Sequence, residues 1–277
     1  MSKIVVRLDR VQLVSWAPQG RKPPLLKGFA ITRDSFVRSQ TNIKTYARCR
    51  QYRSTTSDAK IYWQYERQKA WLKPWKVTMV ADDKTGLSYE QIHNVLGRCR
   101  FYRFLIIEVA ADFSPSTGVD REFVRRHGIF GKSRRANRRQ KAILYWGNRK
   151  SDKFVRCYYK EELASYRVEL ELHSKLLRRE KISTLDDFDG LPLAIYPKHF
   201  QFVTVDWNRL QRHLVRERNS QHLMSGAQQR KSSLSRLRRY LRRHGVTNFH
   251  RFLVPHTINK RMDRALTRWM SDFEDFA

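Results

Sequence analysis

The stretch Tyr145-Trp-Gly-Asn-Arg-Lys-Ser-Asp-Lys-Phe-Val-Arg-Cys-Tyr-Tyr-Lys160 indicates two short strands joined by a turn. Aromatic and β-branched residues favour a strand on either side, while Gly, Asn, Ser and Asp favour the turn between them. Side chains alternate between the faces of a strand, so Arg156, Tyr158 and Lys160 share one face. A third strand-like segment follows at 165–172, and the three segments together predict an antiparallel sheet.

A tyrosine flanked by two cations on one strand face can act on a phosphodiester. Neighbouring cations favour the phenolate form of a phenol, whose ordinary pKa is about 10. Arg156 and Lys160 would also hold a phosphodiester and stabilise the charge that develops during its cleavage. We therefore take Tyr158, Arg156 and Lys160 as catalytic candidates. A cationic hairpin with ordinary strand tyrosines is the alternative interpretation.

The remaining segments extend this hairpin into a larger sheet. Alternating and β-branched residues predict further strands at 4–14, 43–54, 60–67, 74–80 and 104–109. A helix is expected at 87–97 with Ser88 as its N-cap, and Ser116 or Thr117 is expected to cap a short helix that ends at His127. A basic loop is expected at 131–140.

From about residue 174 the pattern becomes helical, with helices expected at 207–216, 233–243 and 258–276. The sequence thus predicts an α+β fold. We place a mostly antiparallel sheet body at 1–182 and a helical, basic C-terminal region at 183–277.

The charge of the chain indicates a polyanionic partner. Lys and Arg number 57 against 26 Asp and Glu, which gives a formal net charge of +31. Nucleic acid is expected rather than a membrane, because no segment approaches the roughly 20 apolar residues of a spanning helix and no N-terminal signal peptide is apparent. Three widely spaced cysteines without a Cys-x-x-Cys pair predict a reducing, cytoplasmic location. Alternation predicts that Cys157 is a small core residue rather than a nucleophile.

Several carboxylates interrupt apolar strand segments on matching faces. Glu108 and Asp112 share a face of one strand, Glu169 and Glu171 share a face of another, and Asp9 interrupts the first strand. A half-buried carboxylate is costly unless it is paired or bound to a metal, and Mg²⁺ or Mn²⁺ prefers oxygen ligands. We expect a divalent metal site built from Glu108 and Glu169 first, then Asp9 and Glu171, with Asp112 the weakest candidate. Pairing of these acids with arginines is the alternative.

Clusters of basic residues outside this site are candidates for DNA contacts. Arg149 lies in the turn of the hairpin, and a helix with leucines on one side carries arginines on the other. The predicted DNA-binding residues are Arg149, Lys132, Arg134, Arg135, Arg138, Arg139, Arg236, Arg239 and Arg243. Trp63, Trp71 and Trp75 alternate with lysines. Their rings are expected either to pack in the core or to stack on unpaired bases.

Three motifs in a fixed order carry a family resemblance. They are Tyr-x-Gly-x-Arg-x-Ser at 145–151, Phe-Val-Arg-x-Tyr-x-Lys at 154–160 and Tyr-Arg-Val-Glu-Leu-Glu at 166–171, preceded by Ile-Glu-Val-Ala-Ala-Asp-Phe at 107–113. This arrangement resembles the trans-acting initiators of rolling-circle replication in plasmids and filamentous phages, and the related relaxases of integrative elements. The resemblance covers about residues 100 to 172.

The resemblance implies a metal-dependent endonuclease that nicks and religates a replication origin. Tyr158 matches the nucleophile, which becomes joined to the 5′ end of the cut strand, and Arg156 and Lys160 match its basic flanks. Glu169 matches the acid of the following strand. Tyr159 stands where the family has a polar residue, so the choice between the two tyrosines stays open. The implied partners are a host helicase, a second copy of the chain and origin DNA that is single-stranded at the nick. The catalytic domain would be 1–182, and 183–277 would bind DNA.

Two other DNA-cleaving classes fit the sequence less well. Initiators with a His-hydrophobic-His metal motif are disfavoured, because none of the nine histidines lies two residues from another. His213-Leu-Val-Arg216 followed by Tyr240 matches a tyrosine-recombinase pattern, but such a short pattern arises easily by chance in an arginine-rich chain. A non-catalytic basic DNA- or RNA-binding protein is the alternative function.

Overall fold

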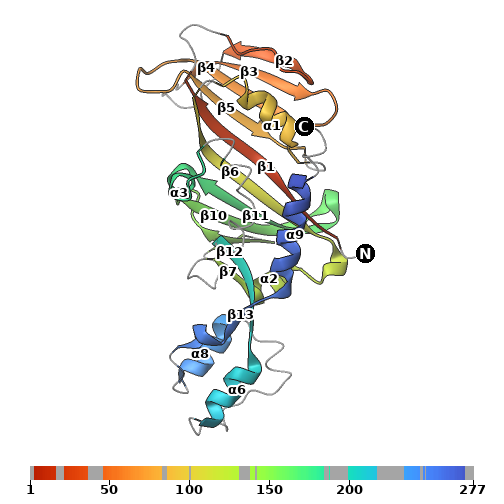
Figure 1. Cartoon of the computed structure of the whole chain (residues 1–277), viewed down its shortest axis with the longest axis vertical. Helices are drawn as coiled ribbons and strands as arrows, with labels where there is room; N and C mark the ends of the chain where they lie inside the picture. The colour runs from red at the N-terminus through yellow and green to blue at the C-terminus, as the bar shows by residue number, and fades with distance from the viewer. Residues whose placement is uncertain are drawn as a thin grey trace.

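The computed structural model describes residues 3–16, 22–36, 46–82, 86–99, 101–130, 138–140, 142–183, 187, 199–216, 234–243, 246 and 248–271. A ten-stranded antiparallel sheet dominates it, in the order β2-β3-β4-β5-β1-β6-β11-β10-β9-β8 (Figure 1). Its strands are β1 (Ile4–Ser15), β2 (Phe29–Phe36), β3 (Tyr46–Ser54), β4 (Lys60–Arg67), β5 (Trp75–Val80), β6 (Tyr102–Phe113), β8 (Arg138–Gln140), β9 (Ile143–Gly147), β10 (Lys153–Lys160) and β11 (Ser165–His173).

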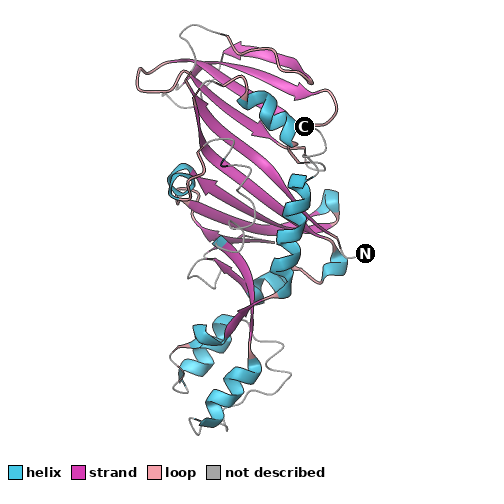
Figure 2. Ribbon diagram, in the orientation of Figure 1, coloured by secondary structure: helices cyan, strands magenta, loops and turns pink. Residues whose placement is uncertain are grey.

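A second sheet of three strands and six described α-helices complete the fold (Figure 2). The small sheet contains β7 (Gly128–Phe130), β12 (Phe200–Val205) and β13 (Leu253–Pro255). The helices are α1 (Tyr89–Leu96), α2 (Arg121–His127), α3 (Ser174–Arg179), α6 (Trp207–Arg216), α8 (Leu234–Arg243) and α9 (Thr257–Ser271), with 3₁₀ turns η1 (Pro115–Thr117), η2 (Glu161–Leu163) and η4 (Phe249–Phe252). The predicted α+β class is confirmed.

One face of the large sheet is apolar and carries the main core. Alternation places Val11 of β1 and Ile107 of β6 on this face, and both are fully buried. Ile92 and Val95 of α1 and Met262 of α9 belong to the same cluster of buried residues. Side chains alternate along each strand, so the polar residues lie on the opposite face of the sheet, away from these helices. Cys157 lies in the core, as alternation predicts.

Most predicted elements are present, but two local expectations were wrong. Ser116 and Thr117 do not cap a helix; they lie in η1, which begins at Pro115, and the next helix, α2, starts after Asp120. The Asp120 carboxylate accepts a hydrogen bond of 2.7 Å from the backbone N–H of Phe123, so it is the cap. The basic segment predicted as a loop at 131–140 ends in strand β8, which pairs with β9; residues 131–137 lie outside the described residues.

Two tryptophans of the lysine-rich segment are core residues. Trp63 and Trp75 are buried, and their ring centroids lie 5.1 Å apart in an edge-to-face arrangement. Trp71 differs, because 73% of its surface is exposed. Core packing therefore accounts for two of the three predicted stacking candidates.

The C-terminal part of the chain builds a second, smaller core. Helices α6 and α8 and the turn η4 pack together through buried leucine and phenylalanine side chains, including Leu210, Leu214, Leu237, Leu241, Phe249 and Phe252. These helices project from one end of the molecule, whereas α9 returns to pack against β1 (Figure 1). No helix in the described part of the chain is long and apolar enough to span a membrane.

Candidate functional site

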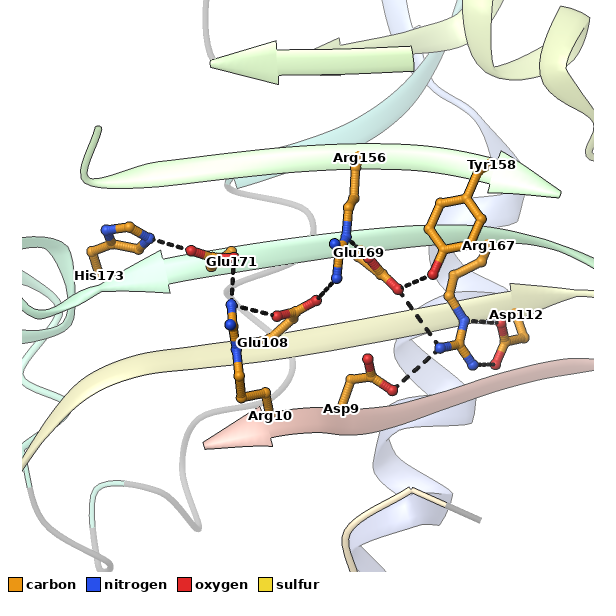
Figure 3. Close-up of polar contacts among 10 residues, drawn as sticks. All are labelled: Asp9, Arg10, Glu108, Asp112, Arg156, Tyr158, Arg167, Glu169, Glu171 and His173. Carbon is orange, nitrogen blue, oxygen red and sulfur yellow. Dashed lines mark hydrogen bonds and ion pairs between the residues drawn. The ribbon is translucent and has the colours of Figure 1, made fainter. Parts of the chain in front are cut away.

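A cluster of buried carboxylates and arginines occupies the polar face of the large sheet. It contains the ten residues drawn in Figure 3, namely Asp9, Arg10, Glu108, Asp112, Arg156, Tyr158, Arg167, Glu169, Glu171 and His173, together with Arg7. We call this set the polar cluster. The side chains come from β1, β6, β11 and β10, which are neighbours in the sheet.

Strand register explains why residues so distant in sequence meet here. Directly opposed residues of an antiparallel pair project from the same face. Glu169 of β11 is opposite Arg156 of β10, and Glu171 is opposite Glu108 of β6. A register shift between Leu8 and Arg10 then interrupts the regular pairing of β1 at Asp9. The result is that acids and arginines from four strands converge on one patch.

Two arginines link the acids in one half of the polar cluster. The Arg156 guanidinium donates to the Glu108 carboxylate at 2.6 Å and also to the Glu169 carboxylate. Arg10 pairs with Glu108 at 2.8 Å and with Glu171 at 2.6 Å. Glu108 and Glu169 are 2% and 1% exposed, so both carboxylates depend on these arginines for compensation of their charge.

The other half of the polar cluster is built around a fully buried arginine. Arg167 is 0% exposed and donates to both oxygens of Asp112, at 2.6 and 2.8 Å, and to Asp9 at 3.2 Å. Arg7 pairs with the same Asp112 carboxylate. Gly86 packs against Arg7 with a φ of +80°, and a Cβ there would lie 2.8 Å from the Arg7 Cδ. The glycine therefore lets the 86–87 backbone approach this ion pair.

Tyr158 is joined to the polar cluster by its hydroxyl. The phenol donates a hydrogen bond of 2.5 Å to Glu169 Oε1. Burial raises the pKa of Tyr158, and this effect outweighs the lowering by Arg167 and Arg156. The pKa lowering that we expected from neighbouring cations is therefore wrong, because the sequence does not reveal how deeply the phenol lies. At neutral pH the phenol is protonated, and Glu169 is placed to accept its proton.

Three carboxylates are close enough to share a cation. Oxygen atoms of Asp9, Glu108 and Glu169 all lie within 4.8 Å of one another. Oxygen ligands at roughly 2.0 to 2.6 Å from one ion fall within about 5 Å of each other, so this donor set fits Mg²⁺ or Mn²⁺. Glu171 is not part of this group; its carboxylate pairs with Arg10 and lies 2.6 Å from His173 Nε2.

The other predicted site residues are dispersed. Lys160 is 7% exposed and lies opposite Ser165 at the end of β10. Arg149 is exposed in the β9–β10 turn, with its guanidinium 5.9 Å from the Phe154 ring centre. Arg138 and Arg139 lie in β8 and Arg236 lies in α8, where Arg239 and Arg243 are exposed; Lys132, Arg134 and Arg135 lie outside the described residues.

The structure adds residues that the sequence analysis missed. Arg10 and Arg7 were not expected to pair with the acids, and nothing in the local pattern of β1 distinguishes them from the other arginines of the chain. Tyr145 of β9 lies opposite Arg156, so it shares the face of Tyr158. Its ring stacks on Phe154, with centroids 5.7 Å apart. Tyr159 is 51% exposed and projects from the opposite face, as predicted.

Comparison with known proteins identifies similarity at the level of structure. No protein-family model and no curated protein sequence matches this chain. A solved structure of a rolling circle replication initiator protein from Geobacillus stearothermophilus is similar at 14% sequence identity and a TM-score of 0.43. The match covers 73% of this chain and 88% of that chain.

Proposed function

We propose that this protein is a site-specific DNA endonuclease and religase that starts rolling-circle replication through a covalent 5′-phosphotyrosine. The observation that carries the proposal is the hydrogen bond from Tyr158 to Glu169 inside the polar cluster. The order of the three sequence motifs along β9, β10 and β11 supports the same assignment.

The reaction begins with attack of the Tyr158 oxygen on the scissile phosphorus. Its proton passes to Glu169, the bond from phosphorus to the 3′ oxygen breaks, the leaving 3′ oxygen takes a proton from solvent water, and the 5′ phosphate stays on Tyr158. The free 3′-hydroxyl then primes synthesis. Religation is the reverse: a 3′-hydroxyl gives its proton to solvent water as its oxygen attacks the phosphotyrosine, and Glu169 returns its proton to the leaving phenol. Because the phosphotyrosine retains the energy of the phosphodiester, resealing needs no further energy source.

Arg156 is the guanidinium best placed to bind the scissile phosphate. Its side chain is 27% exposed and lies two residues from Tyr158 on the same face of β10, whereas that of Arg167 is 0% exposed. Arg10 is 31% exposed, but it belongs to β1, which β6 and β11 separate from β10. A guanidinium matches the geometry of two phosphate oxygens and stabilises the charge that develops on them. Arg167 and Asp112, in contrast, hold one another deep in the sheet, and we assign them the role of fixing the position of the neighbouring strands.

Asp9, Glu108 and Glu169 are the residues that would hold a divalent metal ion. Such an ion, when bound, polarises the scissile phosphate and stabilises its additional negative charge. We assign the nicking and religating activity to residues 1–182 and the duplex contacts to 183–277, where α6 and α8 present arginines.

A covalent-adduct assay tests the proposal. The protein is incubated with Mn²⁺ and a random pool of single-stranded DNA labelled at the 3′ end, and the products are separated in denaturant. We expect a labelled protein–DNA adduct that disappears with a chelator and with Tyr158→Phe. Tyr159→Phe removes the same hydroxyl from the neighbouring, exposed position, so it serves as the matched control and should leave the adduct intact.

Peptide mapping of the adduct then identifies the attacking residue. An adduct on Tyr159 or Tyr145 would move the nucleophile while keeping the enzyme class. Absence of an adduct across the whole pool would contradict nicking and favour a non-catalytic basic DNA- or RNA-binding protein, which the formal net charge of +31 alone also supports.

A further inference from the structure

Helix α6 and the turn η4 border an open hollow of about 330 Å³ whose described lining is rich in arginine. Four of its described lining residues are arginines, and none of the described lining residues is acidic. The described lining comprises Arg209, Arg212, His213, Arg216, Arg251 and Phe252. We call this feature the arginine hollow.

The packing of α6 determines where its arginines point. Leu210 and Leu214 are four residues apart on one helix face, and both are buried in the second core. The spacing of Arg209, Arg212 and Arg216, at three and then four residues, puts them together on a different face, where all three are exposed. The leucines therefore fix the arginines toward the hollow.

Arg251 reaches the hollow from the other side. Phe249 and Phe252 anchor η4 in the second core, so the backbone at Arg251 has little freedom. The Arg251 Nη2 atom lies 2.6 Å from His213 Nε2, and its guanidinium lies 4.8 Å from the Phe252 ring centre. The fourth guanidinium is thus held against α6 by contacts that do not neutralise it.

Four guanidinium groups around one hollow repel each other. Like charges one helical turn apart destabilise a helix, and none of the described lining residues provides a carboxylate to offset them. In the polar cluster, by contrast, every arginine pairs with at least one acid. Within the described residues, the lining of the arginine hollow therefore carries positive charge without an acid beside it, which suits an anionic ligand.

We propose that the arginine hollow binds backbone phosphates of duplex DNA; the choice of DNA rests on the proposed function. Guanidinium groups bind phosphate oxygens in a bidentate manner. Stacking of unpaired bases is disfavoured, because the one aromatic ring of the described lining apart from His213 belongs to Phe252, which is 1% exposed. The seven-residue step from Arg209 to Arg216 spans about 10 Å of helix, close to the roughly 12 Å width of the major groove.

The proposal also explains the His213-Leu-Val-Arg216 pattern without a second catalytic centre. The pattern places His213 and Arg216 in the hollow, while Tyr240, the matching tyrosine, packs against the second core. The two residues therefore serve phosphate binding. Helix α8 presents Arg239 and Arg243 from the same small core, so both helices turn leucines inward and cations outward.

A salt titration of duplex binding tests the arginine hollow. The triple variant Arg209→Ala, Arg212→Ala and Arg216→Ala is compared with Arg98→Ala, Lys175→Ala and Arg178→Ala, which removes three exposed cations elsewhere. The match extends to local geometry, since Arg212 and Arg178 both donate to the carbonyl four residues earlier at 3.4 Å. Anisotropy of labelled duplex DNA of mixed sequence gives the dissociation constant at each salt concentration.

We expect the hollow variant to bind more weakly, with a log–log salt slope shallower by about 2.7 units, since each phosphate that is no longer neutralised lowers the slope by about 0.9. The distant control should keep a slope close to that of the unchanged protein. Replacing the same three arginines by lysine should restore the slope, because the charges return. The proposal would be overturned by equal weakening in the hollow variant and the distant control, by an unchanged slope, or by a failure of the lysine variant to restore the slope. Binding of RNA duplex that depends on these arginines, without binding of DNA duplex, would overturn it as well.

The outcome is separable from that of the proposed function. Adduct formation by the unchanged protein is measured in parallel on single-stranded DNA. If duplex binding depends on the arginines of the hollow but no adduct forms, the nicking proposal is wrong and the phosphate-binding proposal stands. If an adduct forms but duplex binding does not depend on these arginines, the nicking proposal stands and the phosphate-binding proposal is wrong.

Discussion

Replacing Glu169 by glutamine tests whether this carboxylate accepts the proton of Tyr158. The side chain keeps its size but loses the charge that receives a hydrogen bond of 2.5 Å from the phenol. Its other partners are Arg156 and, at 3.6 Å, Arg167. The change therefore removes a proton acceptor and one of five carboxylates from the polar cluster.

The protein should remain folded after this change. Removing one partner of a buried ion pair costs about 3 to 5 kcal/mol when the other charge is left alone. Here Arg156 keeps Glu108 at 2.6 Å, and Arg167 keeps Asp112 at 2.6 and 2.8 Å. Because each arginine retains a carboxylate, we expect the free energy of unfolding to fall by only about 1 to 3 kcal/mol, the range for removal of a hydrogen bond to a charged group.

The rate of adduct formation should fall much more than the stability. A positioned general base contributes about 10² to 10⁴ in rate. Without it the reaction depends on the phenolate, and burial raises the pKa of Tyr158 above its usual value. With a pKa of 10 or more, at most about one phenol in a thousand is ionised at pH 7. The rate of Glu169→Gln should therefore rise about tenfold per pH unit, whereas the unchanged protein should show little pH dependence near neutrality.

Glu108→Gln is the matched control. Glu108 is equally buried and pairs with the same Arg156, but its second ion-pair partner is Arg10, and the Tyr158 phenol donates to Glu169 instead. Both glutamates are proposed metal ligands, so either change should raise the Mn²⁺ concentration needed for the half-maximal rate, but Glu108→Gln should leave the pH profile flat. Single-turnover adduct formation between pH 6 and 9 at saturating Mn²⁺ distinguishes the two. A Glu169→Gln rate within tenfold of the unchanged protein at pH 7, or a flat profile, would refute the assignment of Glu169 as base.

Two further predictions concern other parts of the fold. Changing Arg236, Arg239 and Arg243 of α8 together to alanine should weaken duplex binding. The log–log slope of binding against salt should become shallower by about one unit for each arginine that binds a phosphate. If the folded variant fails to form the adduct on single-stranded DNA, α8 instead helps to build the active site. Gly86→Ala should lower the free energy of unfolding, measured by urea denaturation, by more than Gly28→Ala does. Both glycines have a positive φ, at +80° and +74°, but only at Gly86 would the new Cβ meet Arg7. Equal decreases in the two variants would mean that this close approach does not affect stability.

The sequence predicted the part of the site that depends on local alternation. Strands β10 and β11 are regular over their whole length, so the faces of Arg156, Tyr158 and Glu169 followed from counting residues. The role of β1 did not follow in the same way, because the register shift at Asp9 depends on pairing with β6, which lies about a hundred residues later. The ion pairs of Arg10 and Arg7 depend on that long-range pairing, and no local pattern encodes it.

The sequence analysis missed strands β2, β7, β12 and β13, for different reasons. β2 reads Phe-Ala-Ile-Thr-Arg-Asp-Ser-Phe, and its register shift between Ile31 and Arg33 hides the alternation of an edge strand. β7 and β13 have three residues each and form only through pairing with β12. The signal for β12 was available, because Phe-Gln-Phe-Val-Thr-Val is alternating and β-branched, but it lies within a region dominated by helical periodicity.

The charges of the polar cluster link DNA binding to metal binding in the proposed mechanism. Five carboxylates lie beside four arginines there, so a chain of formal net charge +31 keeps an excess of one carboxylate beside the proposed nucleophile. When Arg156 binds a phosphodiester in this mechanism, Glu108 keeps Arg10 at 2.8 Å and Glu169 keeps Arg167 at 3.6 Å, but both lose their shared cation while almost fully buried. A divalent ion held by Asp9, Glu108 and Glu169 would restore the positive charge that these buried carboxylates lose. Metal and DNA should therefore favour each other's binding by the same factor, since coupling between two ligands is reciprocal. Arg156 would be the residue through which that coupling acts.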